Sequence, residues 1–168
     1  MNQNETVFPP PFPPVESTSS EFTKEKYYEA FIGEKYQPYY KEKFQGLEDA
    51  KPKGGFNIAA FFLGAVWLFY RKMYAYGFMY IGFVFISGVI TTMFEMSESI
   101  DRGISIGLAV AMGFGGNGLY KGFIDKKLNA QNMTISEVEK QGGTNPTAAW
   151  SLLLIAIALL SLGIFLEG

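Results

Sequence analysis

The stretch Met73-Tyr-Ala-Tyr-Gly-Phe-Met-Tyr-Ile-Gly-Phe-Val-Phe-Ile-Ser-Gly-Val-Ile-Thr-Thr-Met-Phe94 runs for 22 residues without a charged side chain. A bilayer has a hydrocarbon core roughly 30 Å thick, which a helix of about 20 apolar residues can cross. Two more uncharged stretches follow, at 103–120 and 141–166. The sequence therefore predicts an all-α, polytopic helical membrane protein with transmembrane helices over 74–94, 103–120 and 147–166.

The preceding segment, 56–70, is apolar but short. Sixteen residues of helix, Gly55 to Tyr70, span only about 24 Å. If this segment does not cross, thirteen of the fourteen Lys and Arg residues lie on one face and only Arg102 lies on the other; a crossing splits them eight to six. Because basic residues stay on the cytoplasmic side, we expect a re-entrant or interfacial helix broken near Gly64. Four transmembrane helices are the alternative.

The first third of the chain is polar. Residues 1–20 hold a Pro-rich run, Phe8 to Pro14, and are expected to be a disordered tail. Residues 21–53 predict cytosolic or interfacial helices rich in aromatic residues and Lys, the first starting at Ser20 and ending at Gly33. These helices either lie on anionic lipid headgroups or form a cytosolic cap that packs on the membrane domain.

Residues 54–168 make up the predicted membrane domain, in which 121–146 is a cytosolic loop with short helices. The second span is expected to continue as a helix beyond the bilayer, over Leu119 to Ala130. Thr134 and Glu137 have the spacing of a capping box that starts one of them. Asn145 followed by Pro146 predicts the start of the last transmembrane helix. The expected location is a bacterial cytoplasmic membrane, with several passes and a cytoplasmic N-terminus.

The side chains at the start of the first crossing predict a membrane-interface belt. Trp and Tyr are enriched at headgroup level, and the long side chains of Arg71 and Lys72 can reach lipid phosphates from there. The belt as predicted contains four aromatic residues, Trp67, Tyr70, Tyr74 and Tyr76.

The composition excludes several kinds of chemistry. The chain has no His and no Cys, and its predicted spans contain no carboxylate, so we expect no catalytic residues, no cofactor and no metal site, and hence no enzyme. A formal net charge of −2 gives no reason to expect nucleic acid. Three spaced carboxylates could hold a hard cation, but they are better explained as a solvated acidic loop: Glu95, Glu98 and Asp101.

Glycines mark the second predicted transmembrane helix. Gly113 to Gly118 fit the dinucleotide pattern G-x-G-x-x-G but lack the strand that this motif requires. Gly103 and Gly107 form a G-x-x-x-G pair. We therefore predict a helix-packing surface here, which serves contacts within one chain or between the copies of a homo-oligomer.

The stretch Phe56-Asn-Ile-Ala-Ala-Phe-Phe-Leu-Gly-Ala-Val-Trp-Leu-Phe-Tyr-Arg-Lys-Met-Tyr74 resembles the defining block of a family of small bacterial integral membrane proteins, the domain of unknown function 2628. Further similarity lies at Phe31-Ile-Gly33 with Tyr39, Tyr40 and Phe44, at Asn117 to Tyr120 and at Gly142 to Thr144, so the resemblance covers about Phe22 to Leu166. The matching block singles out Phe56, Asn57, Trp67, Tyr70, Arg71, Lys72 and Tyr74.

Two positions depart from the family pattern. Ile58 stands where the family usually has Trp, and Ala65 stands where it usually has Pro. The resemblance implies a membrane location and a bacterial source, and it brings no established activity.

Two functional classes fit this sequence. The first is a non-enzymatic membrane adaptor or scaffold, whose polar regions recruit an unknown protein partner or bind anionic lipid headgroups of the bilayer. The alternative is a subunit of an oligomeric channel or carrier, with the Gly-rich helix lining a pore.

Overall fold

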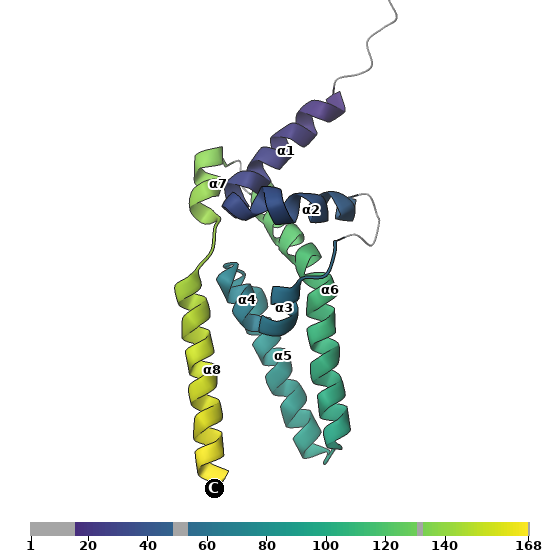
Figure 1. Ribbon diagram of the computed structural model, residues 1–168, viewed down its shortest axis with the longest axis vertical. Helices are drawn as coiled ribbons and strands as arrows, with labels where there is room; N and C mark the ends of the chain where they lie inside the picture. Colours follow the sequence, from purple (N-terminus) through teal and green to yellow (C-terminus); the bar gives the residue numbers. More distant parts are fainter. Residues whose placement is uncertain (1–15, 49–53, 131–132, 168) are drawn as a thin grey trace, which may run out of the picture.

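The computed structural model describes residues 16–48, 54–130 and 133–167, and within these ranges every regular element is a helix (Figure 1). The all-α fold is as predicted. The elements in chain order, with η1 a 3₁₀ helix and η2 a π-helix, are α1 (Glu16–Ile32), η1 (Gly33–Lys35), η2 (Tyr36–Tyr40), α2 (Lys41–Glu48), α3 (Ile58–Leu63), α4 (Ala65–Tyr70), α5 (Tyr74–Met93), α6 (Glu98–Ala130), α7 (Ile135–Gln141) and α8 (Pro146–Glu167).

The first helix is longer than predicted. Residues 1–15 of the predicted tail lie outside the described residues, but α1 begins at Glu16, so 16–20 is helical rather than disordered. The next proline after Pro14 is Pro38, so no proline interrupts α1. The predicted end is confirmed, because Gly33 directly follows α1 with a left-handed φ of +75°.

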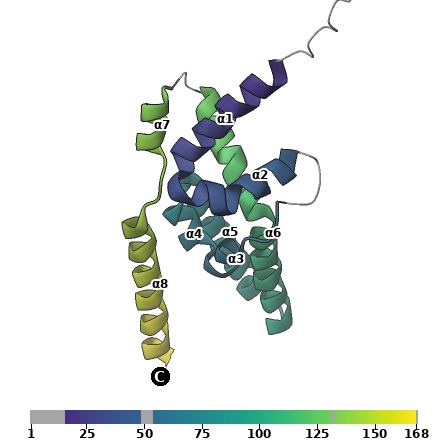
Figure 2. The ribbon, with the colours of Figure 1, turned by 45° about the horizontal axis from the view of Figure 1, so that its top comes forward.

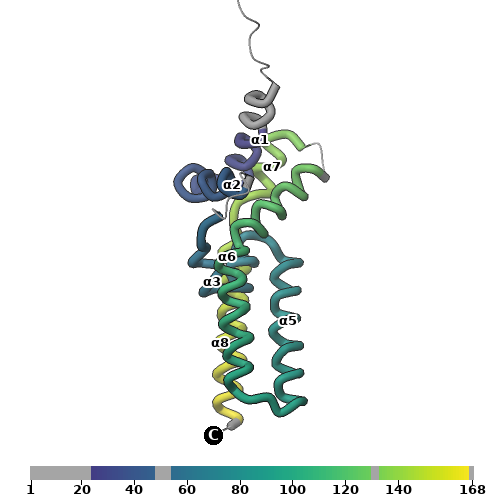
Figure 3. Tube along the Cα trace, turned by 90° about the vertical axis from the view of Figure 1, so that its right-hand side faces the viewer, coloured from purple at the N-terminus to yellow at the C-terminus, as the bar shows by residue number. Residues whose placement is uncertain are grey.

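The helices fall into two zones along the long axis of the molecule. α1, α2 and α7 gather at one end around the C-terminal half of α6, and we call this group the cap (Figures 1 and 2). From the cap, α5, the N-terminal half of α6 and α8 extend in the same direction. Figure 3 shows the α5–α6 turn and the C-terminal end of α8 at the far end of the molecule.

Aromatic side chains form the core of the cap. The rings of Tyr28 and Phe44 meet edge to face at a centroid distance of 5.2 Å, and Tyr40 meets Tyr120 of α6 at 5.3 Å. Phe31, near the end of α1, is also buried. The aromatic residues of the front third therefore pack against one another and on α6, as in the predicted cap.

The segment 56–70 is two short helices, α3 and α4, broken at Gly64 as predicted. Gly64 has φ +44° and ψ −111°, a conformation available essentially only to glycine. Each helix has six residues and is therefore about 9 Å long, so neither can cross a bilayer. The structure therefore has no fourth helix over 56–70 that is long enough to cross a bilayer.

The remaining predicted helix starts are observed. Thr134 and Glu137 form the predicted capping box of α7. Asn145 accepts a hydrogen bond from the amide of Ala148 at 3.0 Å and so caps α8. α6 continues to Ala130, well past the end of the predicted span at Tyr120.

Two helices of the described residues are long and apolar enough to cross a membrane: α5, and the stretch within Ile135–Leu166 whose apolar part is α8. Only 11% and 6% of their apolar windows are buried, whereas the core helix of a soluble protein would be mostly buried. The second predicted span, 103–120, is not among them, because six glycines and Asn117 lower its hydropathy.

Candidate functional site

The turn between α4 and α5 positions an arginine that faces inward. The amide of Arg71 still donates to the carbonyl of Trp67 at 3.0 Å, and Lys72 then adopts a left-handed φ of +60°. Met73, which follows, is fully buried. Arg71 itself is only 6% exposed. The Arg71 side chain therefore lies within the protein rather than along its surface.

Three tyrosine rings surround the guanidinium of Arg71, and we call them the tyrosine cage. The ring centroids of Tyr40, Tyr70 and Tyr120 lie 4.9, 5.4 and 5.2 Å from the Arg71 Cζ atom. Each contact of this kind is attractive by about 0.5–2 kcal/mol, depending on burial. The rings come from η2, α4 and α6, so the cage brings together three elements that are distant in sequence.

Part of the hydrogen-bonding capacity of Arg71 is not used within the described residues. Its Nε and Nη1 atoms are buried and have no hydrogen-bond partner there, and the same holds for the hydroxyl of Tyr120. None of the ion pairs in this part of the chain involves Arg71. A buried charge is costly unless it is paired, and the cage offsets only part of that cost. The site can therefore accept an anion.

The tyrosine cage supplies no negative charge to Arg71 from Tyr40. Burial raises the pKa of the Tyr40 hydroxyl above its usual value, and the nearby Arg71 charge only partly opposes this rise. Tyr40 is thus neutral at neutral pH and gives Arg71 no counter-charge.

Arg71 lines a groove of about 1050 Å³ between η2, α3, α4 and the first turns of α8. Most of the lining side chains are apolar or aromatic, and none is acidic. Lys35 and Lys43 line the same groove. The site thus combines an apolar wall with three basic side chains.

A pair of buried asparagines holds α3 against α6. The Nδ2 atom of Asn57 donates to Oδ1 of Asn117 at 2.9 Å, and Asn117 donates in turn to the carbonyls of Gly54 and Gly55 at 2.6 and 3.2 Å. Oδ1 of Asn57 accepts from the amide of Ala60 at 2.9 Å and so caps α3. Both asparagines are almost completely buried, at 1% and 0% exposed.

Three other residues of the 56–74 block attach α8 and α7. Asn145, at the start of α8, donates from its backbone nitrogen to the Tyr70 carbonyl and from its side-chain Nδ2 to the Tyr74 hydroxyl, both at 2.8 Å. The ammonium of Lys72 donates to the carbonyl of Gly142 after α7. The block therefore connects the long apolar helices to the cap.

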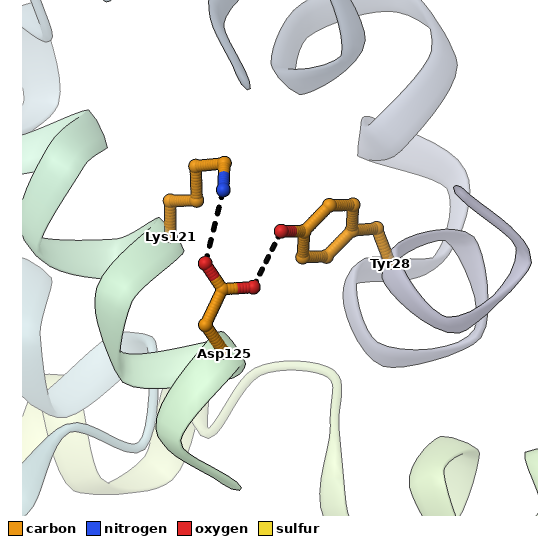
Figure 4. A network of polar contacts seen from close by, with 3 residues as sticks. All are labelled: Tyr28, Lys121 and Asp125. Carbon is orange, nitrogen blue, oxygen red and sulfur yellow. Dashed lines mark hydrogen bonds and ion pairs between the residues drawn. The ribbon is translucent and has the colours of Figure 1, made fainter. Parts of the chain in front are cut away.

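A second polar cluster joins α1 to α6. The hydroxyl of Tyr28 donates to Asp125, and Lys121 forms an ion pair with the same carboxylate at 2.9 Å (Figure 4). Burial raises the pKa of Tyr28, and the hydrogen bond to Asp125 raises it further. The three groups bind one another, so this cluster stabilises the packing of α1 on α6 within the cap.

The predicted aromatic belt is only partly observed. Trp67 is 3% exposed and packs edge to face against Tyr120, so it belongs to the core. Tyr70 and Tyr74 are both 37% exposed, and Tyr76 is partly buried. Trp67 lies in the core rather than at the surface, because its ring packs on Tyr120 and α4 itself packs against α5 and α8.

Phe56 lines the groove, and its ring packs on those of Phe61 and Phe114. The sequence did not predict that Tyr40 and Tyr120 contact Arg71, although both tyrosines belong to the stretches that resemble the family. The available signal was the spacing of Asn117, Tyr120 and Ile124, which share one face of α6 and are all fully buried.

The glycines that pack closely are not the predicted pair. A Cβ atom at Gly103 or Gly107 would meet nothing within 4 Å, so neither contacts another helix of this chain. By contrast, a Cβ atom at Gly113 would lie 2.3 Å from the Phe56 ring, and one at Gly116 would lie 2.8 Å from the Ala60 Cβ. The packing surface of α6 thus lies along the G-x-G-x-x-G stretch, against α3.

The acidic side chains at the far end do not converge. Among the described residues no group of three potential ligands is placed to hold a metal ion. Glu98 instead accepts a hydrogen bond from Arg102 at 2.8 Å, one helical turn away.

One family model matches the chain, over residues 19–125, and its description is "Protein of unknown function (DUF2628)". The match includes the whole 56–74 block, and it ends before Gly142, so the similarity expected around that glycine lies outside it. No curated protein and no solved structure matches the chain. The matched region is 107 of the 168 residues, and the chain therefore belongs to the DUF2628 family.

Proposed function

We propose that this protein is a non-enzymatic adaptor of the bacterial cytoplasmic membrane, which crosses the bilayer three times and holds the helical cap at the cytoplasmic surface. One observation carries the proposal: charge and apolar surface lie at different levels of the molecule. The cap is polar on its outside, whereas α5 and α8 present exposed apolar side chains along most of their length. Soluble monomers rarely expose contiguous apolar surface of this extent.

The distribution of basic residues supports the cytoplasmic assignment of the cap. Twelve of the fourteen Lys and Arg residues lie in the described ranges, and eleven of these belong to the cap or to the groove beneath it. Arg102 alone lies at the far end, beside the α5–α6 turn. This asymmetry is typical of a protein whose cap end is cytoplasmic.

The polarity of Asn117 does not prevent α6 from crossing. Asn117 is fully buried, and its side-chain nitrogen and oxygen both form hydrogen bonds within the protein. A polar group is tolerated at membrane depth when it is satisfied internally and faces other protein segments. The helix can therefore present Ile106, Val110 and Phe114, which are exposed and apolar, to lipid.

Membrane extraction tests the integral location. After washing with alkaline carbonate, the protein should stay with the membrane pellet, whereas a peripheral protein is released. Complete release would contradict the proposal.

Cross-linking in cells tests the adaptor role. A photoreactive amino acid at Gln37, exposed on the cap, should give a discrete adduct with a second protein. The matched control position is Leu159, exposed on α8, which should give only lipid adducts. Equal protein adducts at both positions, or none at Gln37, would argue against an adaptor.

A channel or carrier subunit is the second candidate, favoured by the uncovered face of α6 at Gly103 and Gly107. In that case reconstituted vesicles should show solute flux that Gly107→Leu abolishes. Because this face has no neighbour within the chain, Gly107→Leu should leave the thermal stability of the monomer unchanged. The adaptor proposal predicts no flux.

A further inference from the structure

We propose that the groove beside Arg71 binds one anionic phospholipid, with the headgroup phosphate on Arg71 and the upper acyl chains along α3 and α8. This inference rests on the proposed membrane location and names the ligand of the groove.

The basic side chains of the groove indicate an anion. Nε and Nη1 of Arg71 are buried without a partner, and this side chain as a whole is 94% buried. A guanidinium binds phosphate through charge-assisted N–H···O hydrogen bonds, and two of its three nitrogens have no partner here within the described residues. Lys35 and Lys43 add positive charge in the lining, and no acidic residue balances them there.

The walls of the groove indicate that the anion carries hydrocarbon. On the α3 side, Ile58 and Phe62 line the groove and are 65% and 75% exposed. On the α8 side, Trp150 lines it and is 63% exposed. A free phosphate ion would leave these apolar surfaces in water, whereas acyl chains would cover them. A volume of about 1050 Å³ is at the upper end of the range for small-molecule pockets, which suits a headgroup together with the first part of its chains.

The groove also lies at the level where phospholipid headgroups would be. α3, α4 and the first turns of α8 are situated between the cap and the long apolar helices (Figure 1). Tyr70, at 37% exposed, lies at this level as expected for an interfacial aromatic residue. A lipid can therefore enter the groove sideways from the surrounding leaflet.

Tryptophan fluorescence provides a direct test, because the chain has only two Trp residues, Trp67 and Trp150, and both line the groove. In a Trp150→Phe background the remaining fluorophore is Trp67, which is 3% exposed. Brominated phosphatidylglycerol, titrated into the full-length protein in detergent, should quench Trp67 in a saturable manner. Brominated phosphatidylcholine, whose headgroup has no net charge, should require at least about tenfold more lipid.

Substitutions separate the site from general lipid contact. Arg71→Gln should weaken the phosphatidylglycerol effect about ten- to a hundredfold, because a hydrogen bond to a charged group contributes about 1.5–3 kcal/mol. Lys35→Gln and Lys43→Gln, which alter exposed or partly exposed side chains and leave the core intact, should each weaken it about fivefold. The matched control is Arg102→Gln at the far end, which should have no effect.

Several results would overturn the inference. The first is equal quenching by the two brominated lipids, and the second is unchanged quenching in both Arg71→Gln and the lysine variants. The third is displacement of phosphatidylglycerol by millimolar inorganic phosphate, which would indicate a site for the free ion. Failure here, in a protein that resists carbonate extraction, would leave the membrane location intact. Release by carbonate would instead remove the proposed function itself.

Discussion

At the scale of single residues, buried polar side chains determine how this chain folds. Asn117 lies in the middle of a glycine-rich, apolar part of α6, yet it is fully buried and connects that helix to the segment before α3. Asn57 depends on it, since its side-chain nitrogen donates to Asn117. Satisfied polar pairs of this kind specify one arrangement of helices, because any shift leaves a buried group unpaired.

Asn117→Leu should therefore lower the free energy of unfolding by about 1–3 kcal/mol, because the side chain of Asn57 and the carbonyl of Gly54 both lose a partner. Thermal unfolding in detergent, followed by circular dichroism, measures this change. The control is Ser87→Ala, which removes only a hydrogen bond to Val84 within α5 and should cost no more than about 0.5 kcal/mol. Equal losses would contradict the assigned role of Asn117.

Tyr28 should make the stability of the cap depend on alkaline pH. In the unfolded chain its hydroxyl titrates near pH 10, and in the folded chain its pKa is raised by burial and by the bond to Asp125. The contribution is thus fully present below the unfolded pKa. It falls as the pH rises above that value, by up to about 1.4 kcal/mol per pH unit, because only the unfolded state loses the proton.

Thermal midpoints measured from about pH 8 to about pH 11 should fall more steeply for the wild-type protein than for Tyr28→Phe. Phenylalanine keeps the ring that packs on Phe44 but cannot titrate. Parallel curves for the two proteins would show that Tyr28 is not the group responsible.

At the scale of elements, the break between α3 and α4 decides whether the 56–70 segment crosses. Gly64 combines a positive φ with close packing, since a Cβ atom there would lie 2.7 Å from the Tyr80 hydroxyl oxygen. Any side chain would therefore be strained by the backbone and would also displace Tyr80.

Gly64→Ala should destabilise the protein by about 1–3 kcal/mol, and the double variant Gly64→Ala, Tyr80→Ala should not recover the wild-type stability, because the backbone strain remains. The matched control is Gly82→Ala in α5, where a Cβ atom meets nothing within 4 Å and helix propensity improves. Unfolding in detergent compares the three variants. Equal behaviour of Gly64→Ala and Gly82→Ala would mean that the break is not required.

Local sequence rules predicted most of these elements. The capping box at Thr134, the cap at Asn145 and the break at Gly64 follow from residue type and spacing, so the sequence alone was sufficient. The start of α1 was placed too late, because a stretch without proline can extend a helix at little cost. The predicted continuation of the second span beyond the bilayer is confirmed, since α6 continues into the cap as far as Ala130.

The candidate site could not be predicted in the same way. Arg71 was expected to extend to lipid phosphates, because a basic residue beside an apolar run usually does so. The structure buries it instead, among rings that come from positions 40, 70 and 120 of the chain. Periodicity within one helix contains no information about such contacts between distant segments. The same limit explains why Gly113 and Gly116, rather than Gly103 and Gly107, pack against another helix.

At the scale of the whole molecule, the 56–74 block joins the cap to the long helices. Arg71 packs on rings of η2 and α6, Lys72 bonds to the residue after α7, and Tyr74 bonds to the start of α8. The part of the family pattern that is most specific thus coincides with the centre of the structure. These contacts hold the cap in one position relative to the long helices, which in the proposed orientation sets its depth in the bilayer.

The central claim is the sidedness that follows from three crossings. The chain contains no cysteine, so single cysteines can report the side of the membrane directly. Suitable positions are Glu139→Cys on the exposed face of α7, Glu98→Cys at the far end, and a cysteine added after Gly168.

In intact cells, a membrane-impermeant maleimide applied from the periplasm should label the cysteine at 98 and the one after Gly168. It should label the cysteine at 139 only after the cells are permeabilised. Labelling of position 139 together with either of the other two before permeabilisation, or protection of the cysteine after Gly168, would contradict the three-crossing account.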